Sequence, residues 1–298
     1  MTHQTVLEQE AVTALLTPPV ADGTYIDATY GGGGHSTQIL SKLTATATLL
    51  ALDCDEWAEK NAATITDSRF VFKRSNFFHL QEMATEAGIA SAHGVLFDLG
   101  VSSPQLDVAE RGLSFQRTGP LDMRLDRRQK TTVAHLLATE DEQTLIHIFK
   151  TYGEEPEARR VAKAICAKRH EITDTTSLAK VVADSKRLRM PGRHPATLVF
   201  QALRMEVNSE LANLRRGLEA ACKLLATRGR LVVISFHSLE DRLVKHLLRG
   251  PAFPGVGRIN QLNMEAVGNL VTPSEDEVAA NPRARSARMR VFVKLAAL

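Results

Sequence analysis

YIDATYGGGGHS, at Tyr25–Ser36, is the segment from which the fold class of this chain can be predicted. Thr24–Thr29 is a short, mostly apolar run, which is typical of a buried strand, and four glycines follow almost at once. Glycine lets the backbone approach a ligand closely because no Cβ stands in the way. A strand, a glycine turn and then a helix over Ser36–Leu43 predict the first unit of an open α/β sheet.

The alternation of strand and helix continues outward from this unit. The segment ATLLALD, Ala47–Asp53, is a second apolar run, and a helix is expected over Glu56–Ala63. Further strands are expected at Arg69–Lys73, Gly94–Asp98, Leu231–Phe236 and Met289–Lys294. Strands that alternate with helices at this spacing predict a parallel sheet.

Between these strands lies a long stretch with a helical, polar pattern and no apolar run typical of a strand. We therefore expect one doubly wound α/β domain formed by residues 1–118 and 196–298. An all-helical domain, residues 119–195, would be inserted into it. After the insertion, apolar residues at steps of three and four predict one long helix over Phe200–Leu225.

A second local pattern stands at the start of the last long helix. Ser238 and Asp241 form an S-x-x-D sequence, which predicts a capping box for a helix over Leu239–Leu248.

Composition limits the class of protein. The 298 residues are 44% hydrophobic, and no run approaches 18 apolar residues, so no transmembrane helix is expected. The first residues, MTHQTVLEQEAV, lack the pattern of a signal peptide. Three scattered cysteines without a C-x-x-C pair argue against a zinc site and for a reducing compartment. We expect a cytoplasmic protein with no bound metal and no membrane contact.

The charge is unevenly distributed although the net charge is only +3. Residues 158–196 hold ten Lys and Arg against three Asp and Glu, and residues 281–298 hold five against none. Two basic zones on an otherwise acidic chain suggest a polyanionic partner.

Carboxylates stand where three of the predicted strands end. Asp53 follows Gly33 by 20 residues, the spacing at which an acid reaches a ribose hydroxyl in nucleotide-binding α/β folds. Asp27 and Asp98 lie at the ends of two other strands. Because the carboxyl ends of parallel strands share one edge of the sheet, all three acids should face one crevice.

Several ligands compete for such a crevice. The dinucleotide pattern G-x-G-x-x-G is not completed, because Ser36 or Thr37 occupies its last position, which disfavours NAD. No G-x-x-x-x-G-K-[ST] occurs, which disfavours a P-loop nucleotide site. S-adenosylmethionine has no pyrophosphate, and its ribose and ammonium groups suit carboxylates such as Asp53 with Asp27 or Asp98.

The segment FDLGVSSPQLD, Phe97–Asp107, places small polar side chains directly after a strand. Methyl transfer to an amine needs a group that orients the N–H and later takes the proton. Asp98, Ser102 and Ser103 are the catalytic candidates. An RNA-binding factor without catalysis, and a methyltransferase for DNA or a small molecule, remain open on these residues alone.

Several segments together resemble the bacterial small-subunit ribosomal RNA cytosine-N4 methyltransferases of the RsmH (MraW) family. They are YIDATYGGGGHS, FDLGVSSPQLD, ERGLSF, PLDMRLD, YGEE, HPAT, FQALRMEVNSEL, ISFHSLEDR and NPRARS. The resemblance runs from about Thr5 to about Arg290. It implies a Rossmann-like methyltransferase domain with a helical inserted domain. Four residues depart from the family pattern: Cys54 and Glu56 differ from a usual acid-basic-acid-proline run, and Leu113 and Leu198 stand where phenylalanine and arginine are usual.

The resemblance implies methylation of the exocyclic amine of one cytidine in the decoding region of 16S ribosomal RNA, within the small ribosomal subunit. The helical insertion would then recognise RNA. The contacts to S-adenosyl-L-methionine map onto Gly33, Gly34, His35, Asp53, Phe77, Asp98 and Gln105. The sequence leaves the oligomeric state open, a homodimer included.

Overall fold

The computed structural model describes residues 5–20, 22–188, 191–249 and 262–296, except the side chains of Ser103, Pro104 and Arg249. The chain divides into two compact units. One comprises Met1–Gly100 with Leu211–Leu298, and the other comprises Val101–Glu210.

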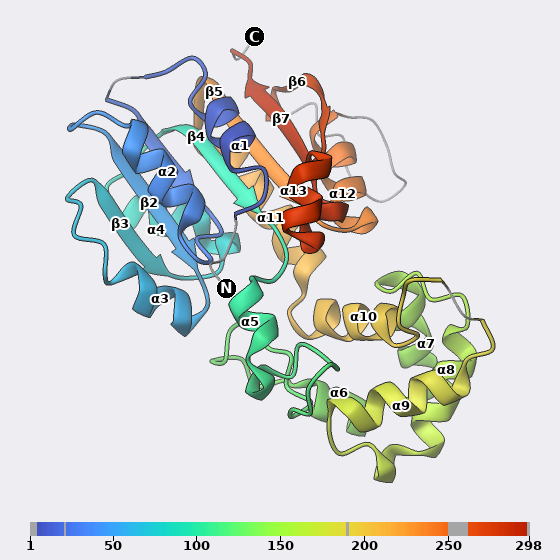
Figure 1. Cartoon of the computed structure of the whole chain (residues 1–298). Helices are drawn as coiled ribbons and strands as arrows, with labels where there is room; N and C mark the ends of the chain where they lie inside the picture. Colours follow the sequence, from blue (N-terminus) through green and yellow to red (C-terminus); the bar gives the residue numbers. More distant parts are fainter. Residues whose placement is uncertain (1–4, 21, 189–190, 250–261, 297–298) are drawn as a thin grey trace. The chain divides into compact units, whose positions relative to one another are not determined.

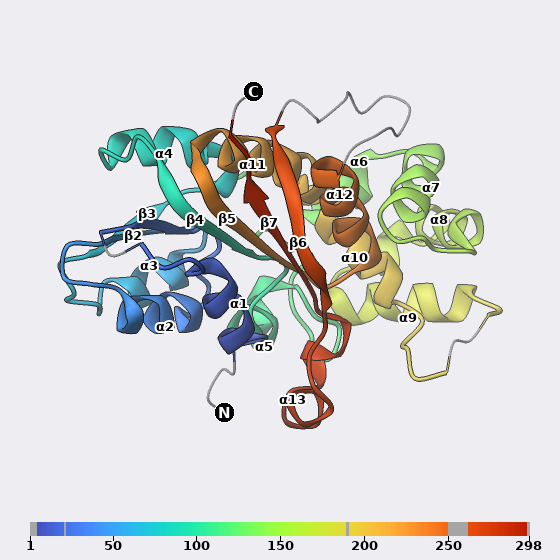
Figure 2. The same cartoon turned by 90° about the horizontal axis from the view of Figure 1, so that it is seen from above.

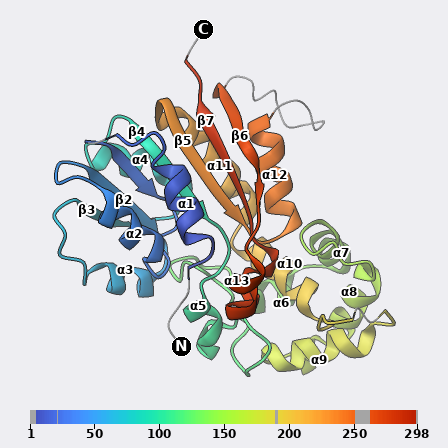
Figure 3. The same ribbon diagram turned by 45° about the horizontal axis from the view of Figure 1, so that its top comes forward.

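The first unit is built on a seven-stranded sheet, counted over the described residues, in the order β3-β2-β1-β4-β5-β7-β6 (Figure 1). The strands are β1 (Thr24–Asp27), β2 (Thr48–Asp53), β3 (Phe70–Arg74), β4 (Ala92–Asp98), β5 (Leu225–Ser235), β6 (Met264–Val271) and β7 (Arg288–Lys294). The first five pair in parallel, and β7 lies antiparallel between β5 and β6, as Figure 3 shows. The predicted α/β class with a mainly parallel sheet is confirmed.

Helices cover both faces of this sheet (Figure 2). One face packs against α4 (Leu80–Glu86), α11 (Glu210–Leu224) and α12 (Ser238–Arg249). The other packs against α1 (Glu8–Leu15), α2 (Gly34–Lys42) and α3 (Glu56–Ala62). Short elements complete the unit: η1 (Phe77–His79), α13 (Glu275–Ala280) and η5 (Pro282–Ser286).

Burial on both faces explains why the central strands are continuous apolar runs. Ile26, Leu50, Val95 and Leu231 have no exposed surface. Strands covered by helices on both sides lose the alternation of apolar and polar residues that a half-exposed strand shows. Because the strands themselves are apolar, a polar residue at a strand end marks the point where the chain leaves the core.

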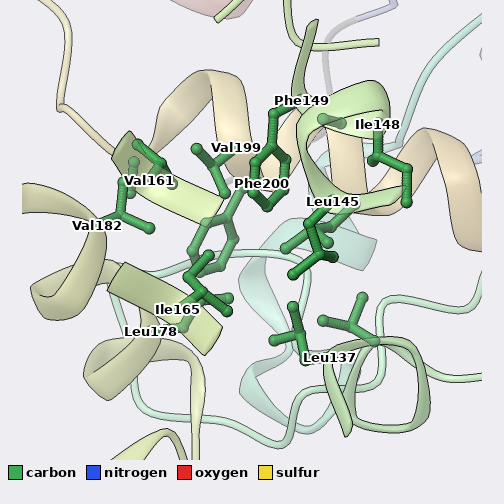
Figure 4. Packing of buried hydrophobic residues seen from close by; sticks show 14 of the residues in the cluster. Leu137, Leu145, Ile148, Phe149, Val161, Ile165, Leu178, Val182, Val199 and Phe200 are labelled. Carbon is green, nitrogen blue, oxygen red and sulfur yellow. The ribbon is translucent and has the colours of Figure 1, made fainter. Parts of the chain in front are cut away.

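The second unit is all-helical over its described residues. Its helices are α5 (Ser103–Asp107), η2 (Ala109–Arg111), α6 (Val133–Thr139), α7 (Glu142–Thr151), α8 (Ala158–Ala167), η3 (Arg169–Glu171), α9 (Thr175–Ser185) and α10 (Thr197–Val207). Their apolar stripes meet in one core, in which Phe149 and Phe200 are central (Figure 4). No helix among the residues described in either unit is long and apolar enough to cross a membrane.

The helical unit comprises Val101–Glu210. It therefore begins before residue 119 and ends after residue 195, the two bounds that the sequence predicted. Val101 and Leu106 already pack against the helical core, and α10 contributes Val199 and Leu203 to it. The segment after β4 forms the short helices α5 and η2, which are too short for a helical period to mark them as part of the insertion.

The prediction of one long helix over Phe200–Leu225 is wrong. The chain forms α10 and α11 instead, with a break at Asn208 and Ser209, whose φ of 49° is left-handed. At the break, the side chain of Asn208 binds the backbone of the loop that contains Met123 and Leu125. Its Nδ2 donates to the carbonyl of Met123 at 2.9 Å, and its Oδ1 accepts from the N–H of Leu125 at 2.8 Å. The apolar spacing continues across the break, so the sequence pattern does not reveal it.

Candidate active site

Three carboxylates stand side by side at the carboxyl edge of the sheet. In the parallel register, Asp27 at the end of β1 lies opposite Ala51 of β2 and opposite Leu96 of β4. Asp53 and Asp98 each end their strand two residues further on. The three acids therefore share one edge, as their positions at the strand ends predict.

The glycine turn leads from this edge into α2. The N–H of Tyr30 still pairs with the carbonyl of Leu52 at 2.8 Å, and the N–H of Gly33 closes the turn on the carbonyl of Tyr30 at 2.8 Å. Gly31 and Gly33 have φ values of 51° and 80°, a left-handed conformation that glycine adopts without strain. A Cβ on Gly33 would lie 2.5 Å from the hydroxyl of Tyr30, so another residue fits there only if the Tyr30 side chain moves.

Asp53 is bonded to the turn itself. Its Oδ2 accepts from the N–H of Gly31 at 2.8 Å, and its Oδ1 accepts from the N–H of Asp55 at 2.9 Å. Burial raises the pKa of Asp53 to about 6, against the lowering effect of these two hydrogen bonds. The carboxylate is half-buried, so it keeps a surface on which a ligand can bind.

Asp27 is more deeply enclosed, with 1% of its surface exposed. Its Oδ2 accepts from the hydroxyl of Ser36 at 2.7 Å, and its Oδ1 accepts from the N–H of Thr29 at 3.2 Å. Burial raises its pKa to about 6. Both oxygens are engaged within the protein, so Asp27 ties the start of α2 to the end of β1.

Asp98 has a different environment from Asp27. Its Oδ2 lies 3.6 Å from Nδ1 of His35, while its Oδ1 is buried and has no hydrogen-bond partner among the described residues. Its side chain is 23% exposed. Burial raises the pKa of Asp98 well above its usual value, and the charges of Asp27 and Glu240 raise it further. Asp98 is the acid of the three that still lacks a hydrogen-bond donor for one oxygen.

Two residues that the sequence did not single out support the glycine turn. Asn61 of α3 donates its Nδ2 to the carbonyl of Gly32 at 3.0 Å and to the hydroxyl of Tyr30 at 3.4 Å. Burial and the charges of Asp27 and Asp53 raise the pKa of Tyr30 to about 12, which keeps its hydroxyl protonated. An asparagine within a short helix gives no sequence signal that it reaches a turn 29 residues earlier.

Glu240 and Asp241 are neighbouring acids at the start of α12 whose carboxylates bind different groups. The carboxylate of Glu240 accepts from the N–H of Phe236 at 2.9 Å, and its other oxygen lies 3.1 Å from Nε2 of His237. Asp241 instead accepts from Arg290 at 2.7 Å and from Arg288 at 3.2 Å, both in β7. Two arginines of β7 therefore hold Asp241, and α12 begins at Ser238, one residue before its predicted start. The capping box of Ser238 and Asp241 stays a prediction.

The remaining predicted site residues have defined local environments. Phe77 packs its ring at 75° against Phe97, 5.6 Å between centroids, and faces Gly217 of α11. Ser102 and Gln105 lie in the second unit, where Oε1 of Gln105 accepts from the N–H of Ser102 at 2.8 Å. The Ser103 side chain lies outside the described residues. Their contacts with a cofactor or an acceptor stay predictions.

Two of the departures from the resemblance, Leu113 and Leu198, are both 8% exposed. An arginine at position 198 would have to be accommodated where this chain buries an apolar side chain.

Comparison with known proteins gives matches over nearly the whole chain. The MraW methylase family matches residues 1–295. The ribosomal RNA small subunit methyltransferase H of Methylobacillus flagellatus is 47% identical over 99% of this chain and 95% of its own length. That of Chromohalobacter salexigens is 49% identical over 98% of this chain and 92% of its own.

A crystal structure of an rRNA methylase from Streptococcus thermophilus covers 99% of this chain and 100% of that one, with 11% identity and a TM-score of 0.46. The assignment rests on the sequence matches, in which nearly half of all positions are identical over almost the full length of both partners. The chain therefore belongs to the MraW methylase family.

Proposed function

We propose that the protein transfers a methyl group from S-adenosyl-L-methionine to the N4 amine of one cytidine in the decoding region of 16S ribosomal RNA. The observation that carries the proposal is the set of three carboxylates around the glycine turn, of which Asp27 is buried and Asp53 and Asp98 are partly buried. Among the described side chains, His35 is the basic group within ion-pair distance of Asp27, Asp53 or Asp98. Such a concentration of negative charge favours a ligand with cationic groups.

The residues present fit that cofactor. The unpartnered Oδ1 of Asp98 can accept from an ammonium group, whereas both oxygens of Asp27 are already engaged. Asp53 stands beside the turn with a half-buried carboxylate, where it can accept from ribose hydroxyls. Gly33 gives the turn a left-handed conformation, and without a Cβ its backbone can lie close to a ligand.

Methyl transfer requires the protein mainly to position the two reactants and to accept the proton that is released. The cofactor's sulfonium supplies the methyl group, and much of the rate enhancement can come from holding the two reactants in line. The lone pair of cytosine N4 is delocalised into its ring, so an acceptor on the N4–H bond strengthens the nucleophile. Asp98, Ser102 and Ser103 are proposed to provide that acceptor and to take the released proton.

The nucleic acid is proposed to be bound by the basic zones at residues 158–196 and 281–298. Specific RNA recognition favours loops and unstacked bases, and a base must leave its stack to enter an active site. Phosphate contacts by Lys and Arg make binding fall steeply with salt. Affinity for the RNA that stays flat from low to moderate salt would remove the basic zones from the proposal.

The decisive experiment uses small ribosomal subunits from cells that lack the family's methylase. The purified protein and isotopically labelled S-adenosylmethionine are added, and the RNA is digested and mapped by mass spectrometry. One N4-methylcytidine in the decoding region is expected. Label on another base, or on DNA and not on RNA, would contradict the proposal.

Variants assign the roles within the site. Asp98→Ala and Ser103→Ala should each lower turnover strongly, while Asp107→Ala, at an exposed acid, serves as the control. Normal turnover and normal cofactor affinity in Ser103→Ala would remove Ser103 from the mechanism. A calorimetric titration separates this function from an oxidoreductase, which would bind NAD, and from a non-catalytic RNA-binding factor, which would bind neither ligand.

A further inference from the structure

Three aromatic rings form a ladder in the helical unit that runs from its core to its surface. Phe200 of α10 is 5% exposed and sits in the middle of the apolar cluster (Figure 4). Phe115 is half-buried and meets Phe200 edge-on, at 79° with 5.0 Å between centroids. His194 is exposed and stacks on Phe115, at 27° with 4.4 Å between centroids.

The outermost ring is held in place although it is exposed. Nδ1 of His194 accepts from the N–H of Ala196 at 3.2 Å, and the His194 carbonyl accepts from the N–H of Thr197 at 3.1 Å. Among the described residues, Phe115 is the ring that His194 contacts. An exposed side chain whose orientation is already fixed loses little entropy when another group binds to it.

The segment that carries this ring is basic and fastened at its base. Lys186 donates to Glu155 at 2.8 Å and to the carbonyl of Pro195 at 3.2 Å, so the two ends of the segment are tied together. Arg187 and Arg193 between them are exposed. The segment that carries His194 thus also exposes cationic side chains, which attract phosphates.

We propose that His194 is a platform on which an unpaired base of the RNA substrate stacks. The inference rests on the proposed function, because it takes RNA as the partner. Every base offers a π-face, and proteins that bind single-stranded nucleic acid combine basic grooves with such rings. Phe115 and Phe200 support the platform from below and link it to the core.

The test compares His194→Ala with His194→Tyr in binding to a 16S RNA fragment that contains the decoding region. Loss of one stacked base weakens binding by about 10-fold, and a tyrosine ring should keep the affinity within about twofold of the original. His170→Ala is the matched control, since His170 is another exposed histidine of the same basic zone, with its side chain 80% exposed. Cofactor affinity should not change in any of the three, and each should unfold in one cooperative transition well above the temperature of the binding assay.

Salt dependence separates stacking from charge. His194→Ala should leave the slope of log affinity against log salt unchanged, whereas Arg193→Ala should reduce it by about 0.7 if Arg193 contacts a phosphate. An affinity of His194→Ala equal to that of His170→Ala, or a failure of His194→Tyr to restore binding, would overturn the platform. A wild-type protein that binds the RNA through His194 but does not methylate it would leave the platform standing and refute the proposed methylation instead.

Discussion

The backbone N–H of Gly31 donates a 2.8 Å hydrogen bond to Oδ2 of Asp53, 22 residues further along the chain. This bond joins the glycine turn after β1 to the carboxylate at the end of β2. The acid that is proposed to hold the ribose therefore also shapes the turn that receives the rest of the cofactor.

Asp53→Ala should weaken binding of S-adenosylmethionine by roughly 10-fold to 100-fold, because hydrogen bonds to a charged group contribute about 1.5–3 kcal/mol. The binding can be followed through Trp57, the one tryptophan of the chain, which lies at the start of α3. Glu56→Gln, at an exposed acid of the same helix, should bind as the wild type does. Equal affinities in the two variants would exclude Asp53 from the site.

Gly33→Ala should lower both stability and cofactor affinity. Its φ of 80° disfavours a side chain, and its Cβ would press on the Tyr30 hydroxyl at 2.5 Å. Gly88→Ala is the matched control, because Gly88 has a φ of 72° but no atom within 4 Å of an added Cβ. The left-handed conformation alone should cost about 1–2 kcal/mol in each, and any excess in Gly33→Ala measures the contact with Tyr30. Equal unfolding free energies in urea would show that Tyr30 yields without cost.

Binding of S-adenosylmethionine should release protons near pH 6.5. Burial raises the pKa of Asp27 and Asp53 to about 6, so part of each is protonated in the free protein near that pH, and burial raises the pKa of Asp98 well above its usual value. Cationic groups of the ligand favour the ionised carboxylates and lower these pKa values, so affinity should rise as pH increases from about 5 to 7. Calorimetry in two buffers of different ionisation enthalpy counts the protons.

Asp98→Asn provides the control for that measurement. It removes one titrating carboxyl, so fewer protons should be released, while Glu82→Gln at an exposed acid should leave the number unchanged. A proton count of zero at every pH would mean that the carboxylates are already ionised before the ligand binds.

Lys186→Met should destabilise the protein by about 3–5 kcal/mol, because it leaves a buried carboxylate without its partner. The side chains of Lys186 and Glu155 are 4% and 0% exposed and lie 2.8 Å apart. Lys168→Met, which breaks an exposed pair with Glu171 at 3.5 Å, should change the unfolding free energy by less than about 1 kcal/mol. If Lys186→Met/Glu155→Gln is no more stable than Lys186→Met, the loss comes from packing and not from the unpaired charge.

The pattern of apolar runs was enough to predict the α/β class of the first unit, its mainly parallel sheet and the edge at which its site lies. Continuous apolar runs mark strands that are covered on both faces, and the acid at each strand end marks where the chain leaves the core. The positions of Asp27, Asp53 and Asp98 follow from that pattern alone. The family resemblance supplied the methyl acceptor, which no periodicity or spacing reveals.

The different hydrogen-bond partners of these carboxylates became visible only in the folded chain. Asp27 and Asp98 look alike in sequence, yet Ser36 and Thr29 occupy both oxygens of Asp27 while one oxygen of Asp98 has no partner among the described residues. The reach of Asn61 to the glycine turn was equally hidden from the sequence. Helical and strand periods report which face of an element is buried, whereas the partner of a polar side chain depends on elements far away in sequence. That is why the fold and the edge of the site were predictable, and the role of each carboxylate was not.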